Sequence, residues 1–414
     1  MKYYYPDYFN DFKCVGGKAC PDSCCIVWQI NVDKETLKKY KNVGGELGCR
    51  MAEKINQKTG QIMQHGEERR CEFLNDDNLC DIVSELGEGY LSETCHTHPR
   101  HEEVYDNVRE RSLAITCPIA CKTLLEREEP VVIKTEEVPS KKEHDRYFDE
   151  PLFEQVIFTR DQILKLEQNR NLSIAKRMTL VLGLSHDIER RFRKRAERKK
   201  NGIISKLFPS HPQFSLDEKE AIHRIAAEYQ KDNAYEKMSS HIKKEAMSEK
   251  IILDTEATTS LGIMTDMIFS LCTMEALKVT WIPYIQSVLN IRSEFKENEY
   301  NDLQKEFSGV LKETALEQLL FYFSYVYCGG SVYDEMLCAK IKMAVVNTLI
   351  IRELWFMKWL ENNKSLNIDE QTEIAHWYVR EIENSDENME QWDSLMQRNP
   401  RFSLKNILTF LSKM

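Results

Sequence analysis

The sequence lacks an apolar run long enough to cross a membrane. No uninterrupted apolar stretch approaches the ~20 residues that a spanning helix needs. The first residues, MKYYYPDYFNDFK, also contain no apolar signal segment and no small-residue cleavage site. From these two absences we predict a cytoplasmic protein that is not embedded in a membrane and does not use Sec-type export.

An excess of positive charge is absent as well. The chain has 57 Lys and Arg residues against 67 Asp and Glu residues, which gives a formal net charge of -10. Proteins that bind nucleic acid generally present a basic face to the phosphates. We therefore predict no nucleic-acid partner, and the composition specifies no oligomeric state.

Two familiar cofactor motifs are missing. No glycine-rich GxGxG loop follows a strand, so the sequence does not predict a Rossmann-type cofactor site. A radical-type CxxxCxxC triad is also absent, because Cys20 and Cys24 have the first interval but Val27 occupies the third position. Cys117 and Cys121 fail in the same way at Leu124. A cofactor site in this chain would need another architecture.

Cysteine, by contrast, is concentrated near the N-terminus, where ten of the 13 cysteines lie within the first 121 residues. Closely spaced thiolates are typical ligands of zinc and of iron-sulfur clusters. Disulfides are typical of exported chains, which the first residues do not predict. A third possibility is that a cysteine is simply a small apolar residue of the core. We predict this role for the four cysteines that have no nearby cysteine partner. These are Cys49, Cys272, Cys328 and Cys338.

Composition divides the chain into three parts. Residues 1–125 hold the cysteines and few periodic apolar stretches, so we expect metal to form the core of a cysteine-rich metal-binding domain. Residues 126–150 carry two prolines and many charges and are predicted to be a linker. Residues 151–414 show helical periodicity, which predicts an α-helical bundle domain and a mainly α protein.

The helical periodicity defines eight stretches in this second half. They are residues 151–170, 173–199, 216–231, 246–275, 301–328, 332–360, 367–396 and 403–413. Within 301–328, the aromatic string FYFSYVY (residues 321–327) could form a cofactor or substrate site. Its helical spacing favours core packing instead.

The segment from His376 to Trp392 is the main candidate for chemistry outside the cysteines. Read as one helix, it places its polar residues in two neighbouring rows. One row holds Arg380, Asn384 and Glu387, and the other holds Glu381, Ser385 and Asn388. The alternative is an ordinary solvated helix face.

Three blocks of the sequence resemble the flagellin lysine N-methylase family along essentially the whole chain. They are YYPDYFNDFKCVGGKACPDSCCIVWQINVD, CEFLNDDNLCDIVSELGEGYLSETCHTHPR and YVREIENSDENMEQW. The first two blocks are also similar to small CxxCxxCC zinc- or iron-chelating domains. The family motif usually reads close to YSREIEHSEEN, and this chain departs from it at Val379 and Asn384. If the missing histidine is an essential base, the activity is in doubt.

The resemblance implies methyl transfer from S-adenosylmethionine to lysine ε-amino groups of flagellin, with a cysteine-bound [4Fe-4S] cluster or, alternatively, zinc. It places the metal ligands at Cys14, Cys20, Cys24, Cys25, Cys71, Cys80, Cys95 and Cys117. These eight cysteines exceed the needs of one cluster, so a second centre or some thiols that are merely buried are both open.

The C-terminal block supplies the other candidate residues. Catalytic roles fall to Tyr378, Glu381 and Glu383, and cofactor binding falls to Arg380, Ser385, Glu387 and Asn388. Arg380 suits a carboxylate because its guanidinium donates two parallel hydrogen bonds. A different class of function also stays open: a non-enzymatic metal-binding protein whose helical domain binds a partner.

Overall fold

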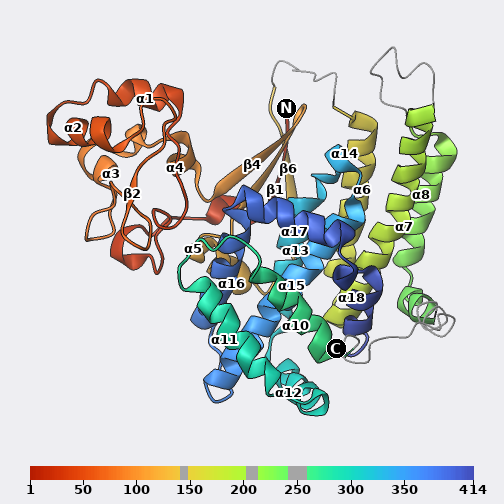
Figure 1. The fold of residues 1–414 in the computed structure, drawn as a ribbon. Helices are drawn as coiled ribbons and strands as arrows, with labels where there is room; N and C mark the ends of the chain where they lie inside the picture. The colour runs from red at the N-terminus through yellow and green to blue at the C-terminus, as the bar shows by residue number, and fades with distance from the viewer. Residues whose placement is uncertain (140–147, 202–212, 241–258) are drawn as a thin grey trace.

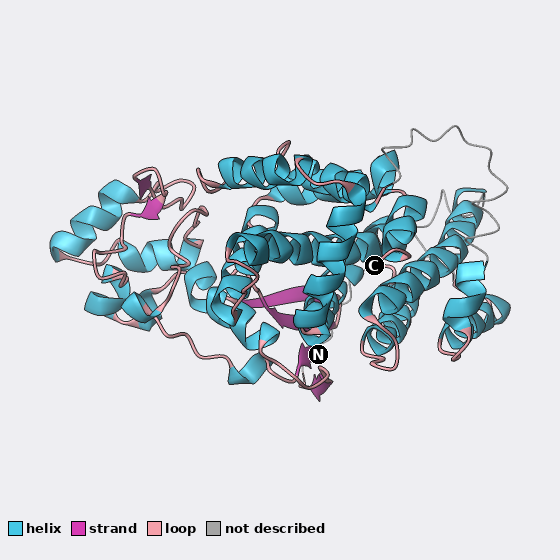
Figure 2. Ribbon diagram, turned by 90° about the horizontal axis from the view of Figure 1, so that it is seen from below, coloured by secondary structure: helices cyan, strands magenta, loops and turns pink. Residues whose placement is uncertain are grey.

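The computed structural model describes residues 1–139, 148–201, 213–240 and 259–414, and its architecture is mainly helical (Figure 1). This confirms the predicted class. A large helical body carries a four-stranded sheet on one side, and a small lobe lies beside them (Figures 1 and 2). No helix in these four ranges is both long and apolar enough to cross a membrane.

The helical body is built around one long buried helix, α15 (Leu337–Glu361). Its middle turns are buried on all sides because apolar residues surround the whole helix. It packs against α7, α13, α16 and α17. The other helices are α5 (Pro118–Leu125), α6 (Glu150–Glu167), α7 (Ile174–Asn201), α8 (Leu216–Tyr229), α10 (Ser260–Leu271), α11 (Trp281–Ser293), α12 (Glu297–Val310), α13 (Glu313–Cys328), α14 (Ser331–Asp334), α16 (Ile368–Glu383), α17 (Asp386–Arg398) and α18 (Leu404–Leu411).

The sheet has the strand order β4-β5-β1-β6. Strand β1 (Lys2–Pro6) runs parallel to β5 (Val108–Leu113) and antiparallel to β6 (Ile133–Glu137). Strand β4 (Arg100–Tyr105) pairs only with β5, so β4 and β6 are the two edges. Strand β6 thus lies inside the segment predicted to be a linker, and its charged residues Lys134, Glu136 and Glu137 are exposed positions of an edge strand.

The small lobe (residues 25–98) has an apolar core of its own. It contains α1 (Lys34–Tyr40), α2 (Gly45–Lys54), β2 (Gln64–His65), β3 (Arg70–Cys71), α3 (Asp81–Leu86) and α4 (Glu93–Thr97). Leu47, Met51 and Phe73 are buried in this core, where the sequence predicted metal alone. Residues on either side of the lobe, such as Phe12 and Leu124, pack into the core of the helical body. Packing therefore divides the chain differently from composition.

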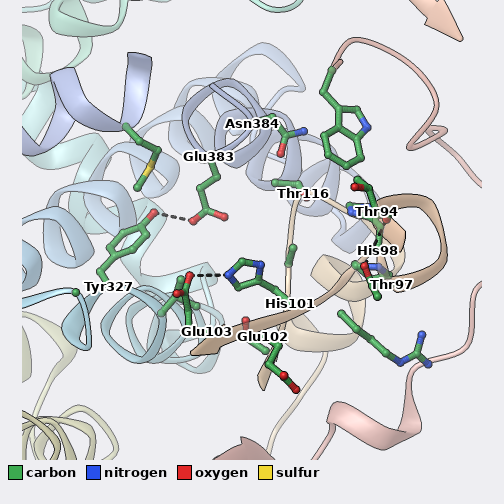
Figure 3. A pocket seen from close by; sticks show the side chains of 18 of the residues that line it. Thr94, Thr97, His98, His101, Glu102, Glu103, Thr116, Tyr327, Glu383 and Asn384 are labelled. Atoms are coloured by element: carbon green, nitrogen blue, oxygen red, sulfur yellow. Dashed lines mark hydrogen bonds and ion pairs between the residues drawn. The ribbon is translucent and has the colours of Figure 1, made fainter. Parts of the chain in front are cut away.

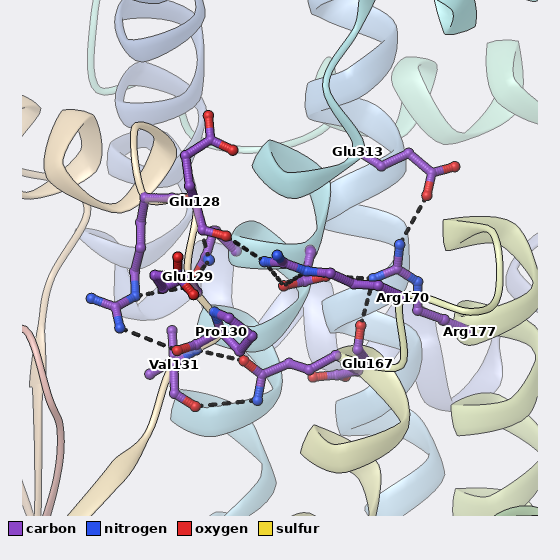
Figure 4. Close-up of polar contacts among 12 residues, drawn as sticks. Glu128, Glu129, Pro130, Val131, Glu167, Arg170, Arg177 and Glu313 are labelled. Carbon is purple, nitrogen blue, oxygen red and sulfur yellow. Dashed lines mark hydrogen bonds and ion pairs between the residues drawn. The ribbon is translucent and has the colours of Figure 1, made fainter.

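A buried polar network joins the helical body to the segment before β6 (Figure 4). Arg177 of α7 donates to Glu317 of α13 at 2.6 Å and to the Glu167 carbonyl at 2.9 Å. Arg170 bonds Glu317 and the Glu128 carbonyl. Burial raises the pKa of Glu167 well above its ordinary value, and Ser324 donates to that carboxyl group at 2.6 Å. Each of these charges is hydrogen-bonded, which is what its burial requires.

Several predicted helix boundaries are wrong. The stretch 301–328 is two helices, because Leu311 and Lys312 have extended backbone conformations between α12 and α13. Helix α11 was not predicted, since Pro283 reads as a helix breaker although proline is tolerated in a first turn. The stretch 246–275 begins within the described residues at Ser260, and residues 246–258 lie outside them.

The predicted helix 367–396 is also wrong as a single element. It ends at Glu383, and α17 begins at Asp386. The Ser385 hydroxyl accepts a hydrogen bond from the Asn388 N–H at 3.2 Å, which caps the new helix. The two polar rows therefore do not form, and the residues of the motif point in different directions.

Candidate functional site

A cleft of about 990 Å³ lies between the small lobe and the helical body. This volume is at the upper end of the roughly 300–1,000 Å³ that is typical of small-molecule sites. The lobe contributes Thr94, Thr97 and His98, and the body contributes β4, α13 and the junction of α16 with α17 (Figure 3). Glu383 and Asn384 stand at that junction and line the cleft.

Glu383 is held by two tyrosines of α13. The hydroxyls of Tyr322 and Tyr327 donate to its two carboxylate oxygens at 2.9 and 2.7 Å. Burial raises the pKa of Glu383, and the two hydrogen bonds partly offset this rise. No cationic side chain among the described residues forms an ion pair with this carboxylate. Glu383 therefore combines a fixed position with an unfilled demand for positive charge.

The direction of these hydrogen bonds is set further inside the protein, at Asn347 of α15. Its side-chain oxygen accepts from the Trp392 indole at 2.7 Å and from the Tyr378 hydroxyl at 2.8 Å. An indole N–H can only donate, so the amide nitrogen of Asn347 must face the Tyr327 hydroxyl, 3.3 Å away. Tyr327 then accepts a hydrogen bond from the Asn347 amide and donates a hydrogen bond to Glu383.

Strand β4 forms another part of the cleft wall on the side of the body. The His101 ring lies 2.7 Å from a Glu103 oxygen, and both side chains point toward the space below Glu383 (Figure 3). The hydrogen bond with Glu103 raises the pKa of His101, with Glu383 and Glu102 adding to the effect. The hydrogen bond with Glu103 therefore favours the protonated, positively charged form of His101.

The cleft is acidic overall. Arg100 and Lys340 are its cationic side chains other than histidine, and Lys340 is already paired with Asp334 and Asp393 at 2.9 Å each. The carboxylates that line it are Asp33, Glu93, Glu102, Glu103, Glu383, Glu390 and Asp393. Such a lining attracts cations and disfavours anions.

Three of the predicted site residues instead hold a loop of the body. Glu381 accepts from the backbone N–H groups of Leu277 and Lys278 at 2.7 and 2.8 Å. The Asn388 side chain accepts from the Glu275 N–H and donates to the Glu275 carbonyl. The Ser385 hydroxyl donates to the Glu275 carboxylate. Burial raises the pKa of Glu381 to about 7. The predicted Glu387 is exposed on the first turn of α17.

Arg380 connects the motif to the cysteine-rich segment. Its guanidinium, 1% exposed as a side chain, donates to Asp22 at 3.2 Å and to the Thr116 carbonyl at 3.1 Å. Trp377 lies beneath it, at 5.0 Å from the ring centroid. A second cavity of about 760 Å³, which includes Asp22 and His376, lies on this side of α16. Arg380 thus bridges two parts of the chain, and its predicted cofactor role stays a prediction.

Electrostatic interactions connect the eight predicted metal ligands in pairs, and Cys24 takes part in several of these pairs. Its thiol interacts electrostatically with those of Cys20, Cys80 and Cys95, and with that of Cys117 from the helical body. Cys25 and Cys71 belong to the same group, and Cys14 faces Cys20. Of the four cysteines assigned to the core, Cys328 and Cys338 are buried, Cys272 is half-buried and Cys49 is exposed.

The thiols suit a metal chemically, but they do not form a closed single-ion site. Burial raises the pKa of Cys71 to about 12 and those of Cys95 and Cys117 to about 11, so their ionised forms need a cation nearby. In the described part of the chain no three His, Cys, Asp or Glu side chains are grouped as ligands of one metal ion. A cluster of several iron atoms separates its ligands more widely than one ion does.

Sequence reasoning missed much of the cleft. Tyr322 and Tyr327 belong to the aromatic string that was assigned to core packing, and both are buried in the core as predicted. Their hydroxyl groups nevertheless reach Glu383 at the cleft, which the core assignment did not include. Their partner Asn347 is hidden in the long apolar helix α15. The string CHTHPRH, which supplies His98 and His101, was available in the sequence as a histidine-rich neighbour of Cys95.

Comparison with known proteins identifies the family. Residues 160–410 match the FliB lysine N-methylase C-terminal domain. The chain belongs to the FliB lysine N-methylase family. The match covers more than half of the sequence and most of the helical body, including α16 and α17. It confirms the family resemblance inferred from the three sequence blocks.

Two curated relatives have similar lengths of matching sequence. The chain is 33% identical over 128 residues to a lysine-N-methylase of Salmonella choleraesuis (strain SC-B67). This alignment covers 29% of this chain and 31% of that relative. It is 32% identical over 127 residues to the flagellar biosynthetic protein FliU of Salmonella muenchen, covering 29% of this chain and 75% of FliU. The aligned region spans about a third of the lysine-N-methylase. No solved structure matches the chain significantly.

The raised pKa of Glu381 predicts a pH-dependent stability. The pKa of this carboxyl group is about 4.3 in the unfolded chain and about 7 in the folded protein, so the folded state binds the proton more tightly. The contribution of Glu381 to the free energy of unfolding therefore falls as the pH increases between these two values. We expect urea denaturation to show the wild type losing stability relative to Glu381→Gln between pH 5 and 7.5. A stability difference that does not change with pH would contradict the raised pKa.

Proposed function

We propose that this protein is a protein-lysine N-methyltransferase that transfers a methyl group from S-adenosylmethionine to lysines of flagellin. The names of the relatives support methyl transfer to lysine and a flagellar context. The observation that carries the proposal is Glu383, fixed by two tyrosine hydroxyls in an acidic cleft without a cationic partner of its own. We place the reaction in this cleft.

A lysine side chain meets two needs of the cleft. Its ammonium group supplies the positive charge that Glu383 lacks, and the tyrosine rings beside it favour cations. The amine must then lose a proton, because its ordinary pKa is about 10.4. The carboxylate of Glu383 is the acceptor we assign, since burial strengthens it as a base. The neutral amine is left with a free electron pair toward the cleft.

S-adenosylmethionine, when bound, supplies an electrophilic methyl group on a positively charged sulfur. The same carboxylates that attract lysine favour that positive charge. Tyr322 and Tyr327 hold Glu383 on one side of the amine, which would leave the opposite side open to the methyl donor. On transfer the donor would leave as the neutral thioether, S-adenosylhomocysteine. Positioning of the amine is therefore the main contribution of these residues.

We further propose that the cysteines around Cys24 hold an iron-sulfur centre of the [4Fe-4S] kind, with zinc as the alternative. This proposal is supported by the electrostatic interactions of Cys24 with Cys20, Cys25, Cys80, Cys95 and Cys117. Bound metal would balance the thiolates and link the small lobe to Cys117 in the body. This would hold the two walls of the cleft at a fixed separation.

Replacing Glu383 tests the proposed site. We expect Glu383→Gln to lower the rate of lysine methylation by about a hundredfold or more, because the amine loses its proton acceptor. Incorporation of labelled methyl into flagellin measures the rate, and circular dichroism checks the fold. Glu294→Gln, an exposed glutamate at the end of α11, is the matched control and should retain the parental rate. A wild type that binds metal but methylates no lysine would favour the non-enzymatic alternative.

The tyrosine hydroxyls predict a shift in pH dependence. Their hydrogen bonds stabilise ionised Glu383, so Tyr327→Phe should raise its pKa and move the acidic limb of kcat/KM upward by about one pH unit. Tyr325→Phe serves as the control on the same helix, because Tyr325 donates to the Tyr4 and Arg111 carbonyls instead. An acidic limb that stays in place in both variants would show that another group titrates.

The metal proposal is tested by replacing two of the proposed ligands, Cys24 and Cys71, of which Cys71 lies in the small lobe. After anaerobic purification, Cys71→Ala and Cys24→Ala should lose iron and sulfide, because each removes a thiolate from the group. Cys49→Ala is the matched control, since Cys49 is exposed on α2 of the same lobe. Iron, sulfide and zinc analysis of the wild type separates a cluster from zinc. Unchanged metal content in both cysteine variants would contradict the ligand assignment.

A further inference from the structure

The free edge of the sheet borders the cleft. Strand β4 pairs with β5 on one side only, and it lies on the side of the sheet that faces the small lobe (Figure 1). Five of its six residues are exposed, and Arg100, His101, Glu102, Glu103 and Tyr105 line the cleft. An unpaired strand edge carries backbone N–H and C=O groups that can bind another strand.

The register shows which backbone groups are unpaired. The Ala114 N–H donates to the Pro99 carbonyl at 2.8 Å, so Pro99 and Ala114 form a hydrogen-bonded pair. Because such pairs alternate along an antiparallel ladder, His101, Glu103 and Tyr105 bond inward to β5. The backbone groups of Arg100, Glu102 and Val104 then face outward along the free edge.

The side chains alternate in the same way. His101 and Glu103 lie on the face of β4 that points toward Glu383, whereas Glu102 points away from it (Figure 3). Glu102 is paired with Arg111 at 2.7 Å, so its charge protects the edge without filling the cleft. The edge therefore combines three outward-facing backbone positions with an acidic cavity directly beside them.

We propose that the acceptor protein enters the cleft as an extended segment that adds to the free edge of β4 and presents its lysine to Glu383. Such strand addition takes affinity from the backbone and selectivity from alternate side chains. The lysine lies on the face shared with His101 and Glu103. Residues two positions before and after it meet the other carboxylates of the cleft, which favours basic side chains there. This inference rests on the proposed function for the identity of the acceptor.

The decisive variant is Val104→Pro. Proline removes an N–H that faces outward, so the ladder with β5 keeps its hydrogen bonds, and edge strands tolerate proline. The Val104 side chain is 52% exposed and leaves no cavity when it is replaced. Thr135→Pro is the matched control on the other edge strand, β6. On either side of β6, the Asp7 N–H donates to the Val132 carbonyl, and the Val138 N–H donates to the Met1 carbonyl. Because hydrogen-bonded pairs alternate along the ladder with β1, the Thr135 N–H faces outward as well.

Binding is measured without turnover, by fluorescence anisotropy of a labelled heptapeptide Thr-Arg-Thr-Lys-Thr-Arg-Thr. Val104→Pro should weaken binding about five- to tenfold, the effect of one backbone hydrogen bond, while Thr135→Pro leaves it unchanged. Peptides with single backbone N-methyl groups should bind in an alternating pattern, weakened at every second residue. Unmeasurable binding by the wild type, equal binding by Val104→Pro, or no alternation would each overturn strand addition.

The same peptide separates this inference from the proposed function. Methylation of the peptide with a KM that Val104→Pro leaves unaltered would retain the methyltransferase and overturn the docking mode. Alternating binding without any methyl transfer would retain the docking mode and overturn the proposed reaction. Both Pro variants should keep the circular dichroism spectrum and metal content of the wild type.

Discussion

The last two turns of α16 are the constraint on which the site depends. Four of their side chains point to four different parts of the chain, because successive helical positions are about 100° apart. Tyr378 bonds the buried Asn347 of α15, and Arg380 bonds Asp22 of the cysteine-rich segment. Glu381 holds the backbone at 277–278, and Glu383 enters the cleft. Tyr378, Arg380 and Glu381 are buried and Glu383 is half-buried, and all four are hydrogen-bonded. A rotation of the helix would therefore break several contacts at once.

The position of the small lobe follows from the same helix. The lobe has its own apolar core, and the polar bridge from Arg380 to Asp22 connects the adjoining cysteine segment to the body. A buried charge that loses its partner costs far more than an exposed one, which makes this bridge specific for one arrangement. The lobe in turn supplies one wall of the cleft, opposite β4 and Glu383. Arg380 and Asp22 therefore connect the cleft wall to the cysteine-rich segment, where the Cys20 thiol donates to the Asp22 carbonyl at 3.1 Å.

Periodicity in the sequence predicted the helical class, and most of the helical stretches have counterparts in the structure, because apolar spacing determines which faces are buried. It did not predict the break at Ser385, where a local side-chain cap overrides continuous periodicity. Of the motif's predicted site residues, Glu383 lines the cleft, whereas Glu381, Ser385 and Asn388 bind a loop more than one hundred residues away in the chain. Asn347 and the two tyrosines could not be selected from sequence, since their roles depend on contacts between α13, α15 and α16.

The charges of the cleft are not equivalent, and their partners explain why Glu383 stands apart. Glu102 faces Arg111, Asp393 faces Lys340, and Glu103 faces His101. Glu383 receives only neutral hydroxyl donors, whose orientation is imposed through Asn347 by an indole that cannot accept. Neutral donors stabilise the carboxylate without cancelling its charge, so Glu383 keeps an electrostatic demand for a cation. A lysine arriving along β4 meets Glu383 from the open side of the cleft, with its backbone held by a strand that the sheet leaves unpaired.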